Sequence, residues 1–293
     1  MSQAMRGRLA TWRALEPSGS RPQHSRERAR FRELEQKLET LQRNHAELNT
    51  EIFDAAQVYR RLCAPRLVRH GDFEIASEVF AVRHLPGDFF TVEQKGRELV
   101  FALGDIAGKG LAAGMWGTHL VGLIRNHTAI STNPELIVAG VNRDFCRQSL
   151  IAPLTSLFVA TLDSWTGNLT FCNAGHPPAL LLRADGELEQ LSDGGPVLGV
   201  VPTAQYESAT VQLRGNDLVL ICSDGILESF DLADQEFGRE RLETEFRRAQ
   251  GGSTESVLYS VLGAVQDFAA PRPLTDDMTL AIIGNTTSER RSG

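Results

Sequence analysis

The sequence has few features that would tie it to a membrane or to an oxidising compartment. It contains four cysteines in 293 residues, and none of them belongs to a C-x-x-C pair. Cys172 and Cys222 lie in apolar runs typical of strands, which favours buried, reduced thiols. No apolar run is long enough to span a bilayer, and the N-terminus lacks the apolar core of a secretion signal. We therefore expect a cytoplasmic protein without a membrane span.

Positive charge is scarce except at the N-terminus. The formal net charge is −7, yet residues 1–30 contain seven Arg and two Glu, so this segment carries +5 and the remainder −12. An arginine-rich tail beside an acidic body can bind nucleic acid or a membrane surface. Because it also contains Pro17, Gly19, Pro22 and several Ser, we interpret residues 1–30 as a solvated, disordered tail. The acidic body argues against a dedicated nucleic-acid binder.

A heptad pattern follows the tail. Apolar residues recur at alternating spacings of four and three from residue 31 until Pro65, which ends the helix. The positions of this seam are Leu34, Leu38, Leu41, His45, Leu48, Ile52, Ala55, Tyr59 and Leu62. A single helix packed on the following domain would also fit. We favour a coiled coil over 31–65 that dimerises the chain, because a polar residue such as His45 within a seam can set its register.

Short strands and blocks of helix make up residues 66–285. The apolar runs include "FEIASEVF", "DFFTVEQKGRELVFALGD", "SLFVATLD", "LTFCNAG", "DLVLICSDG" and "MTLAIIG". Helical spacing occupies 109–130, 134–150, 238–249 and 253–268. Strands joined by hairpins, with helices inserted in blocks, predict an α+β fold. Residues 285–293 are polar and read as a frayed end, so we take 286–293 as a second disordered tail.

The segment "LGDIAGKGLAAG" lacks the residues that a nucleotide-binding loop requires. The phosphate loop G-x-x-x-x-G-K-[ST] would place Gly at position 103 and a hydroxyl at 110, but the sequence has Leu103 and Gly110. The dinucleotide fingerprint G-x-G-x-x-G is absent as well. The segment is therefore not interpreted as an ATP or GTP site.

Aspartates recur at the ends of the predicted strands. Asp88, Asp105, Asp224, and the pair Asp276 and Asp277 each begin or end an apolar run and are flanked by glycine or threonine. Strand-end Asp-Gly is ordinary turn chemistry, so each motif alone is weak. Carboxylates gathered at one rim would repel each other unless cations lie between them, and Mg²⁺ or Mn²⁺ prefers oxygen ligands. A glycine beside a ligand is expected to leave room for water.

The ordered set of motifs resembles the SpoIIE/RsbU branch of the metal-dependent protein phosphatases (PPM family). It comprises "PGDFF", "LGDIAGKG", "TSLFVATLD", "NAGHPPALLLR", "GPVLG", "LVLICSDGILES" and "TDDMTLAII", across about residues 60–285. The resemblance implies an α-β-β-α sandwich, in which two antiparallel sheets lie between helices, preceded by the N-terminal coiled-coil helix.

The resemblance also implies a centre of two Mn²⁺ or Mg²⁺ ions. Asp105 would bridge the ions with the carbonyl of Ile106 beside it, Asp224 and Asp276 would hold the second ion, and Asp88 would act directly or through water. Asp105 and Asp224 are the predicted catalytic residues. Three residues are assigned to outer or phosphate-binding positions: Lys109, Asp277 and Glu228. Lys109 could equally cap the following helix.

By resemblance, the chain is expected to be a protein serine/threonine phosphatase in which an activated water attacks phosphorus. The position two residues after Asp105, which carries a presumed general acid in animal-type members, is Ala107. The expected substrate is a phosphorylated STAS-domain anti-sigma-factor antagonist. An activator protein docking on the N-terminal helix is expected unless the enzyme is constitutive. The alternative is a non-catalytic coiled-coil scaffold, against which the retention of all these aspartates argues.

Overall fold

The computed structural model describes residues 21–148 and 152–285, with the side chains of the first helix described from Ala29 onward. Contacts divide the chain into two units between Asp54 and Ala55. No helix in the described ranges is long and apolar enough to cross a membrane. Residues 1–20 of the predicted tail at 1–30, and the predicted tail at 286–293, lie outside these ranges.

Helix α1 (Arg21–Cys63) begins earlier than the sequence pattern indicated. Residues 21–30, assigned above to a disordered tail, are helical, and the helix ends two residues before Pro65, whose ring blocks continuation. Six large apolar side chains in the part of α1 that belongs to the first unit are between 52% and 68% exposed, namely Phe31, Leu34, Leu38, Leu41, Leu48 and Phe53, whereas Ile52 is half-buried. Pairing of this face in a coiled coil therefore stays a prediction.

The second unit contains two six-stranded sheets. The first has the order β1 (Leu67–His70), β2 (Phe73–Phe80), β12 (Met278–Asn285), β11 (Leu218–Cys222), β7 (Ala179–Leu182) and β8 (Leu188–Leu191). The second has the order β10 (Ala209–Gln212), β6 (Asn168–Ala174), β5 (Thr155–Asp163), β4 (Glu98–Ile106) and β3 (Phe89–Lys95), with β9 (Gly194–Gly195) paired to β6. All pairings are antiparallel except that of β9 with β6.

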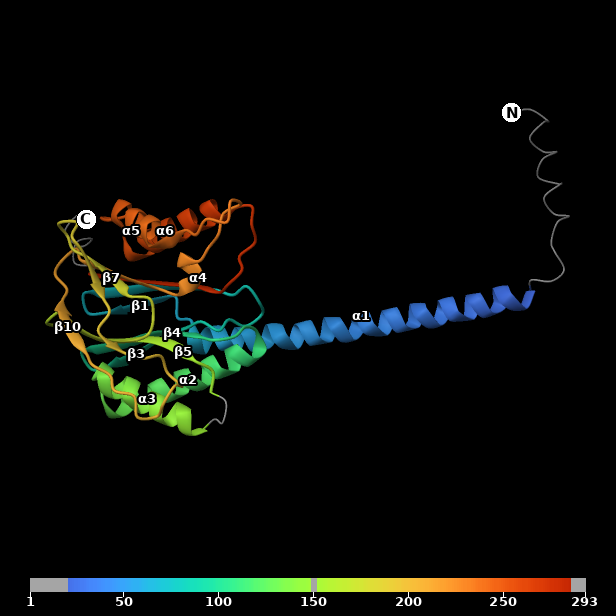
Figure 1. Ribbon diagram of the computed structural model, residues 1–293, viewed down its shortest axis with the longest axis horizontal. Helices are drawn as coiled ribbons and strands as arrows, with labels where there is room; N and C mark the ends of the chain where they lie inside the picture. Colours follow the sequence, from blue (N-terminus) through green and yellow to red (C-terminus); the bar gives the residue numbers. More distant parts are fainter. Residues whose placement is uncertain (1–20, 149–151, 286–293) are drawn as a thin grey trace, which may run out of the picture. The chain divides into compact units, whose positions relative to one another are not determined.

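Helices cover the outer face of each sheet. Helices α2 (Leu111–Ile130) and α3 (Pro134–Gln148) pack on the second sheet, while α4 (Asp224–Leu227), α5 (Gly238–Arg248) and α6 (Thr254–Ala269) pack on the first. Figure 1 shows α5 and α6 on one side of the sheets and α2 and α3 on the other. The predicted sandwich of two sheets between helices is confirmed.

Strand β5 shows why central strands of the sheets appear in the sequence as continuous apolar runs. Successive side chains of a strand point to opposite faces, and both faces of β5 are covered. Leu157 and Val159 lie in the core beneath α2 and α3, whereas Phe158 lies in the core between the sheets. Phe158 stacks there on Phe171 of β6, with 5.8 Å between ring centroids.

Most elements appear where the sequence placed them. The hairpin of β3 and β4 turns at Gly96, whose φ of 62° suits a residue without Cβ. Four short elements were not predicted, namely β1, β9, β10 and α4. They contain between two and four residues each, too few for a periodic pattern to register.

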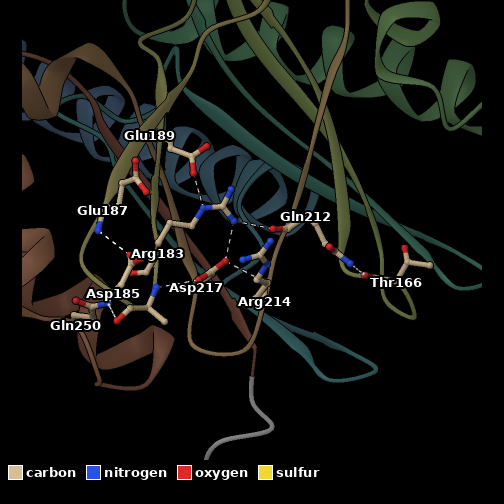
Figure 2. A network of polar contacts seen from close by, with 10 residues as sticks. Thr166, Arg183, Asp185, Glu187, Glu189, Gln212, Arg214, Asp217 and Gln250 are labelled. Carbon is tan, nitrogen blue, oxygen red and sulfur yellow. Dashed lines mark hydrogen bonds and ion pairs between the residues drawn. The ribbon is translucent and has the colours of Figure 1, made fainter.

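A polar network joins the β7–β8 turn to the loop before β11 (Figure 2). Asp217 is buried, and its carboxylate accepts hydrogen bonds from the backbone N–H groups of Ala184 and Arg214 and from Arg183 Nη1, each at 3.0 Å. Arg183 also pairs with Glu189 at 2.5 Å. Asp217 precedes β11, so this network lies at the opposite end of that strand from Asp224.

We predict that Asp217→Asn lowers the free energy of unfolding by about 2 kcal/mol, since it removes the charge that Arg183 faces and turns an amide N–H₂ toward backbone donors. Chemical denaturation would measure the loss. Asp185→Asn, at an exposed position of the β7–β8 turn, is the control and should change the free energy of unfolding by less than about 0.5 kcal/mol. Equal effects of both variants would contradict this interpretation.

Candidate active site

Strand pairing brings the predicted aspartates to one rim of the sandwich. Asp88 precedes β3, and the register Phe89↔Gly104 places it beside Asp105 near the end of β4. Asp224 follows β11 and Asp277 precedes β12, which pairs antiparallel with β11. The hydroxyl of Thr279 in β12 donates to Asp88 Oδ2 at 2.7 Å, so the ends of the two sheets meet at this bond.

Asp88 and Asp105 form the inner part of this rim. Asp88 is 2% exposed, and burial, followed by the charge of Asp105, raises its pKa well above the usual value, although the hydroxyls of Ser223 and Thr279 lower it. Burial, followed by the charge of Asp224, raises the pKa of Asp105 to about 6, against a smaller opposing effect of a hydrogen bond with Asp88. The charge of Asp105 thus opposes the ionisation of Asp88, and the charge of Asp224 opposes that of Asp105.

Asp224 and Asp276 lie further out. Asp224 is the first residue of α4, and burial, followed by the charge of Asp276, raises its pKa. Glu228 is exposed just after α4, and its pKa is raised by partial burial and then by Asp224. The charge of the rim therefore acts on the pKa of Glu228, although the side chain of Glu228 lies outside the rim.

Lys109 supplies positive charge to the rim. Its ammonium lies 2.7 Å from Asp276 Oδ2 and donates to the carbonyl of Thr275 at 2.8 Å. Helix α2 begins after Gly110 without a side-chain cap, so Lys109 does not serve as the helix cap considered from the sequence. Its side chain instead joins the loop at 107–110 to the segment before β12.

Asp277 braces the loop that leads to Asp88. Its Oδ1 accepts from the N–H of Val82 and its Oδ2 from the N–H of Gly87, both at 2.8 Å. A carboxylate committed to two backbone donors has little freedom to turn toward another group. The structure therefore places Asp277 in support of the 82–87 loop.

The glycines around the aspartates allow close packing. A Cβ on Gly104 would lie 2.4 Å from the ring of Phe89, so that space is filled by an aromatic side chain and not, as expected from the sequence, left for water. A Cβ on Gly87 would lie 3.1 Å from the carbonyl oxygen of Ile106. Gly87 thus lets the loop before Asp88 approach the backbone of the predicted metal ligand.

The donor chemistry of the rim suits hard divalent cations, because carboxylates whose pKa values rise through burial and mutual repulsion are relieved by a cation between them. Asp88, Asp105 and Asp224 supply such carboxylates, and Asp276 lies close enough to Asp224 to act on it through its charge. Within the described ranges, however, no three acidic, His or Cys side chains form a group that could hold a metal ion. The aspartates lie along the rim as neighbours and not as a closed set of ligands.

Three residues that hold Asp88 were not identified from the sequence. Tyr59 in α1 donates its hydroxyl to the backbone carbonyl of Asp88 at 2.6 Å, and Ser223 and Thr279 contact the carboxyl group. Tyr59 was assigned to the coiled-coil seam, where an apolar position gives no sign of a role at the rim. Ser223 directly precedes Asp224, but a lone hydroxyl at a strand end carries no distinctive signal.

His176 belongs to a buried turn between β6 and β7. Its Nδ1 lies 2.8 Å from Ser156 Oγ, and its backbone exchanges hydrogen bonds with the side chain of Asn173 at 2.7 and 2.9 Å. Burial lowers the pKa of His176 to about 3, so the ring is neutral in the folded protein at neutral pH.

Comparison with solved structures defines the class of the fold. The chain superposes on the PP2C domain of SiaA from Pseudomonas aeruginosa with a TM-score of 0.72 at 16% identity, covering 81% of this chain and 97% of that domain. RsbX, solved in complex with magnesium, gives a TM-score of 0.57 at 15% identity, covering 74% and 98%. The sandwich is therefore that of the PP2C-type, metal-dependent protein phosphatases.

Within this class the chain belongs to the SpoIIE family. The family model described as Stage II sporulation protein E (SpoIIE) matches residues 95–285. This confirms both the SpoIIE/RsbU branch recognised from the ordered motifs and the assignment to the protein serine/threonine phosphatases.

Two relatives illustrate the range of this similarity. The phosphoserine phosphatase RsbU of Bacillus subtilis is 22% identical over 258 residues, which are 85% of this chain and 74% of RsbU. Protein IcfG of Synechocystis sp. is 23% identical over 188 residues, which are 55% of this chain and only 30% of IcfG. The chain thus spans less than a third of one relative and about three quarters of the other.

We predict that His176 weakens the fold in acid. Below its ordinary pKa of 6.5 the unfolded chain binds a proton at His176, whereas the folded protein does so only near pH 3, so stability falls as the pH drops through this interval. Between pH 7 and 5 the loss is about 2 kcal/mol from this group alone. His176→Gln should show a correspondingly smaller loss in urea denaturation, and an identical loss would contradict the prediction.

Proposed function

We propose that this protein hydrolyses phosphoserine and phosphothreonine in a protein substrate, with two Mn²⁺ or Mg²⁺ ions held by the acidic rim. The supporting observation is the meeting of Asp88, Asp105, Asp224 and Asp276 where the two sheets end, with the pKa values of Asp88, Asp105 and Asp224 raised. When bound, the ions would supply an ionised water for attack on phosphorus and would offset charge on the phosphoryl oxygens.

The residues of the rim divide the work between binding and positioning. Asp105, near the end of β4, would serve both ions, and the carbonyl of Ile106 would complete one of the two sites. Asp224 and Asp276 would hold the other ion. The hydroxyl of Thr279 orients Asp88 by donating a hydrogen bond to the Asp88 carboxylate. Lys109 fixes the position of Asp276 through their ion pair and brings positive charge close to where an anionic phosphate would bind.

A non-catalytic scaffold with the same fold is the second candidate. It would have no reason to keep Asp88, Asp105 and Asp224, three carboxylates whose burial and mutual repulsion cost stability. The buried Asp88, held by a buried threonine, is the clearest case, because an apolar residue there would remove the penalty. The rim therefore favours an enzyme.

We expect Mn²⁺-dependent release of phosphate from a phosphoserine protein, and its loss in Asp105→Asn and Asp224→Asn. Each substitution removes a charge from the proposed metal site while keeping the side-chain volume. The decrease in kcat/KM should exceed about a hundredfold, the loss expected when a catalytic centre loses a charged ligand. Phosphate release after EDTA treatment and Mn²⁺ titration would measure it.

Asp185→Asn is the matched control, since it makes the same chemical change at an exposed turn. It should retain wild-type activity. Full activity in EDTA would exclude the metal-dependent mechanism, and wild-type activity in Asp105→Asn would exclude the assigned role of that residue.

The proposed substrate is a phosphorylated STAS-domain protein in a bacterial partner-switching system. RsbU, which this chain resembles, is named a phosphoserine phosphatase, and a solved structure of similar fold joins RsbU and RsbW domains in one protein. We also propose a cytoplasmic location, in line with such a partner. Dephosphorylation of a purified phospho-STAS protein, compared with a phosphoserine peptide, tests the preference; equal kcat/KM values would reject it.

Helix α1 is proposed to form a homodimer through its apolar face and to receive an activator protein. Sedimentation of the wild-type chain should give twice the monomer mass. Leu34→Glu combined with Leu41→Glu should yield monomers, because both side chains are more than half exposed and would face the partner helix. Leu232→Glu, at a position 74% exposed in the second unit, is the control. A concentration-independent wild-type monomer would reject the dimer.

A further inference from the structure

The last turns of α1 lie against the acidic rim. Tyr59 is 2% exposed, although the large apolar side chains of the same helix between Phe31 and Phe53, apart from the half-buried Ile52, are exposed. Its hydroxyl donates to the backbone carbonyl of Asp88 at 2.6 Å. A buried hydroxyl bonded to the main chain at the start of β3 fixes that residue more firmly than packing alone, because a hydrogen bond has a preferred direction.

The space around this hydroxyl is shaped for it. Helix α2 passes Tyr59 at Gly117, where a Cβ would lie 3.0 Å from the Tyr59 hydroxyl oxygen and 3.5 Å from Ile106 Cδ1. A glycine in a helix interior costs about 1 kcal/mol relative to alanine. The absence of a side chain at Gly117 therefore leaves room for the hydroxyl between α2 and the carbonyl that it contacts.

Asp88 is held from three separate parts of the chain. Tyr59 contacts its backbone carbonyl, Thr279 of β12 contacts its carboxylate, and Asp277 holds the N–H of the preceding Gly87. Thr279 and Asp277 come from the first sheet and its approach, and they restrain the carboxylate and the loop. Tyr59 alone restrains the main chain of Asp88 from the side of α1.

We propose that Tyr59 is a positioning residue for the metal centre: its hydroxyl fixes the backbone of Asp88 and so sets where the Asp88 carboxylate stands relative to bound Mn²⁺ or Mg²⁺. The inference rests on the proposed function, since it requires the rim to bind these ions. Residues that orient metal-binding groups affect metal affinity strongly although they do not touch the ion.

Tyr59→Phe removes the hydroxyl and keeps the ring. In the 293-residue chain, freed of metal with EDTA and dialysed, calorimetric titration of the variant with MnCl₂ should show a Kd about tenfold higher than that of the wild type. The Mn²⁺ concentration for half-maximal activity should rise in parallel. Tyr206→Phe is the matched control, because Tyr206 is also buried but its hydroxyl has no hydrogen-bond partner among the described atoms.

Gly117→Ala separates positioning from stability. The new Cβ should displace the Tyr59 hydroxyl and weaken Mn²⁺ binding. Because alanine has a higher helix propensity than glycine, the substitution also stabilises α2 and opposes a decrease in melting temperature. Gly122→Ala in the same helix is its control, because a Cβ there meets nothing within 4 Å, and it should leave Mn²⁺ binding unchanged.

The outcomes are distinguishable. The inference is supported if the wild-type protein binds Mn²⁺, Tyr59→Phe binds it with a higher Kd, and the control variants keep the wild-type Kd. If the wild-type protein binds Mn²⁺ and Tyr59→Phe binds it with the same Kd, the inference is overturned and the proposed function is left intact. This holds even if the variant melts at a lower temperature. No Mn²⁺ binding by the wild type rejects the proposed function and this inference together.

Discussion

The repulsion among carboxylates at the meeting edge of two sheets is the constraint on which this molecule depends. Burial and mutual charge raise the pKa values of Asp88, Asp105 and Asp224, so the fold must hold in place groups that would otherwise separate. It does so with the Thr279 hydroxyl on Asp88 and the Lys109 ammonium on Asp276. The core packed between the two sheets sets the distance across which these contacts act.

The second unit supports the rim from both faces. On one side, α2 lies close enough for Gly117 to meet Tyr59, and on the other, α4 begins at Asp224 itself. The network around Asp217 fixes the start of β11, and Asp224 follows the end of the same strand. Strand β11 is therefore held at both ends. Structural and functional polar groups therefore occupy opposite ends of the same strand.

The sequence predicted the long strands and helices of the second unit and the placement of the aspartates at strand ends, for identifiable reasons. Strands such as β5, covered on both faces, appear as continuous apolar runs, and aspartates beside glycine stand out at their ends. It did not predict the role of Tyr59, because a heptad position looks the same whether it meets a second helix or its own domain. It also misjudged Gly104, whose missing side chain makes room for Phe89.

The sequence by itself determined the family, the two-sheet sandwich and the set of aspartates, because these depend on residue order and on the periodicity of burial. Only the tertiary structure decided which groups hold each aspartate. Asp277 and its neighbour Asp276 are adjacent in sequence, yet one braces the 82–87 loop while the other pairs with Lys109. Contacts of this kind join residues more than a hundred positions apart, and their partners are set by how the strands pair and the sheets stack.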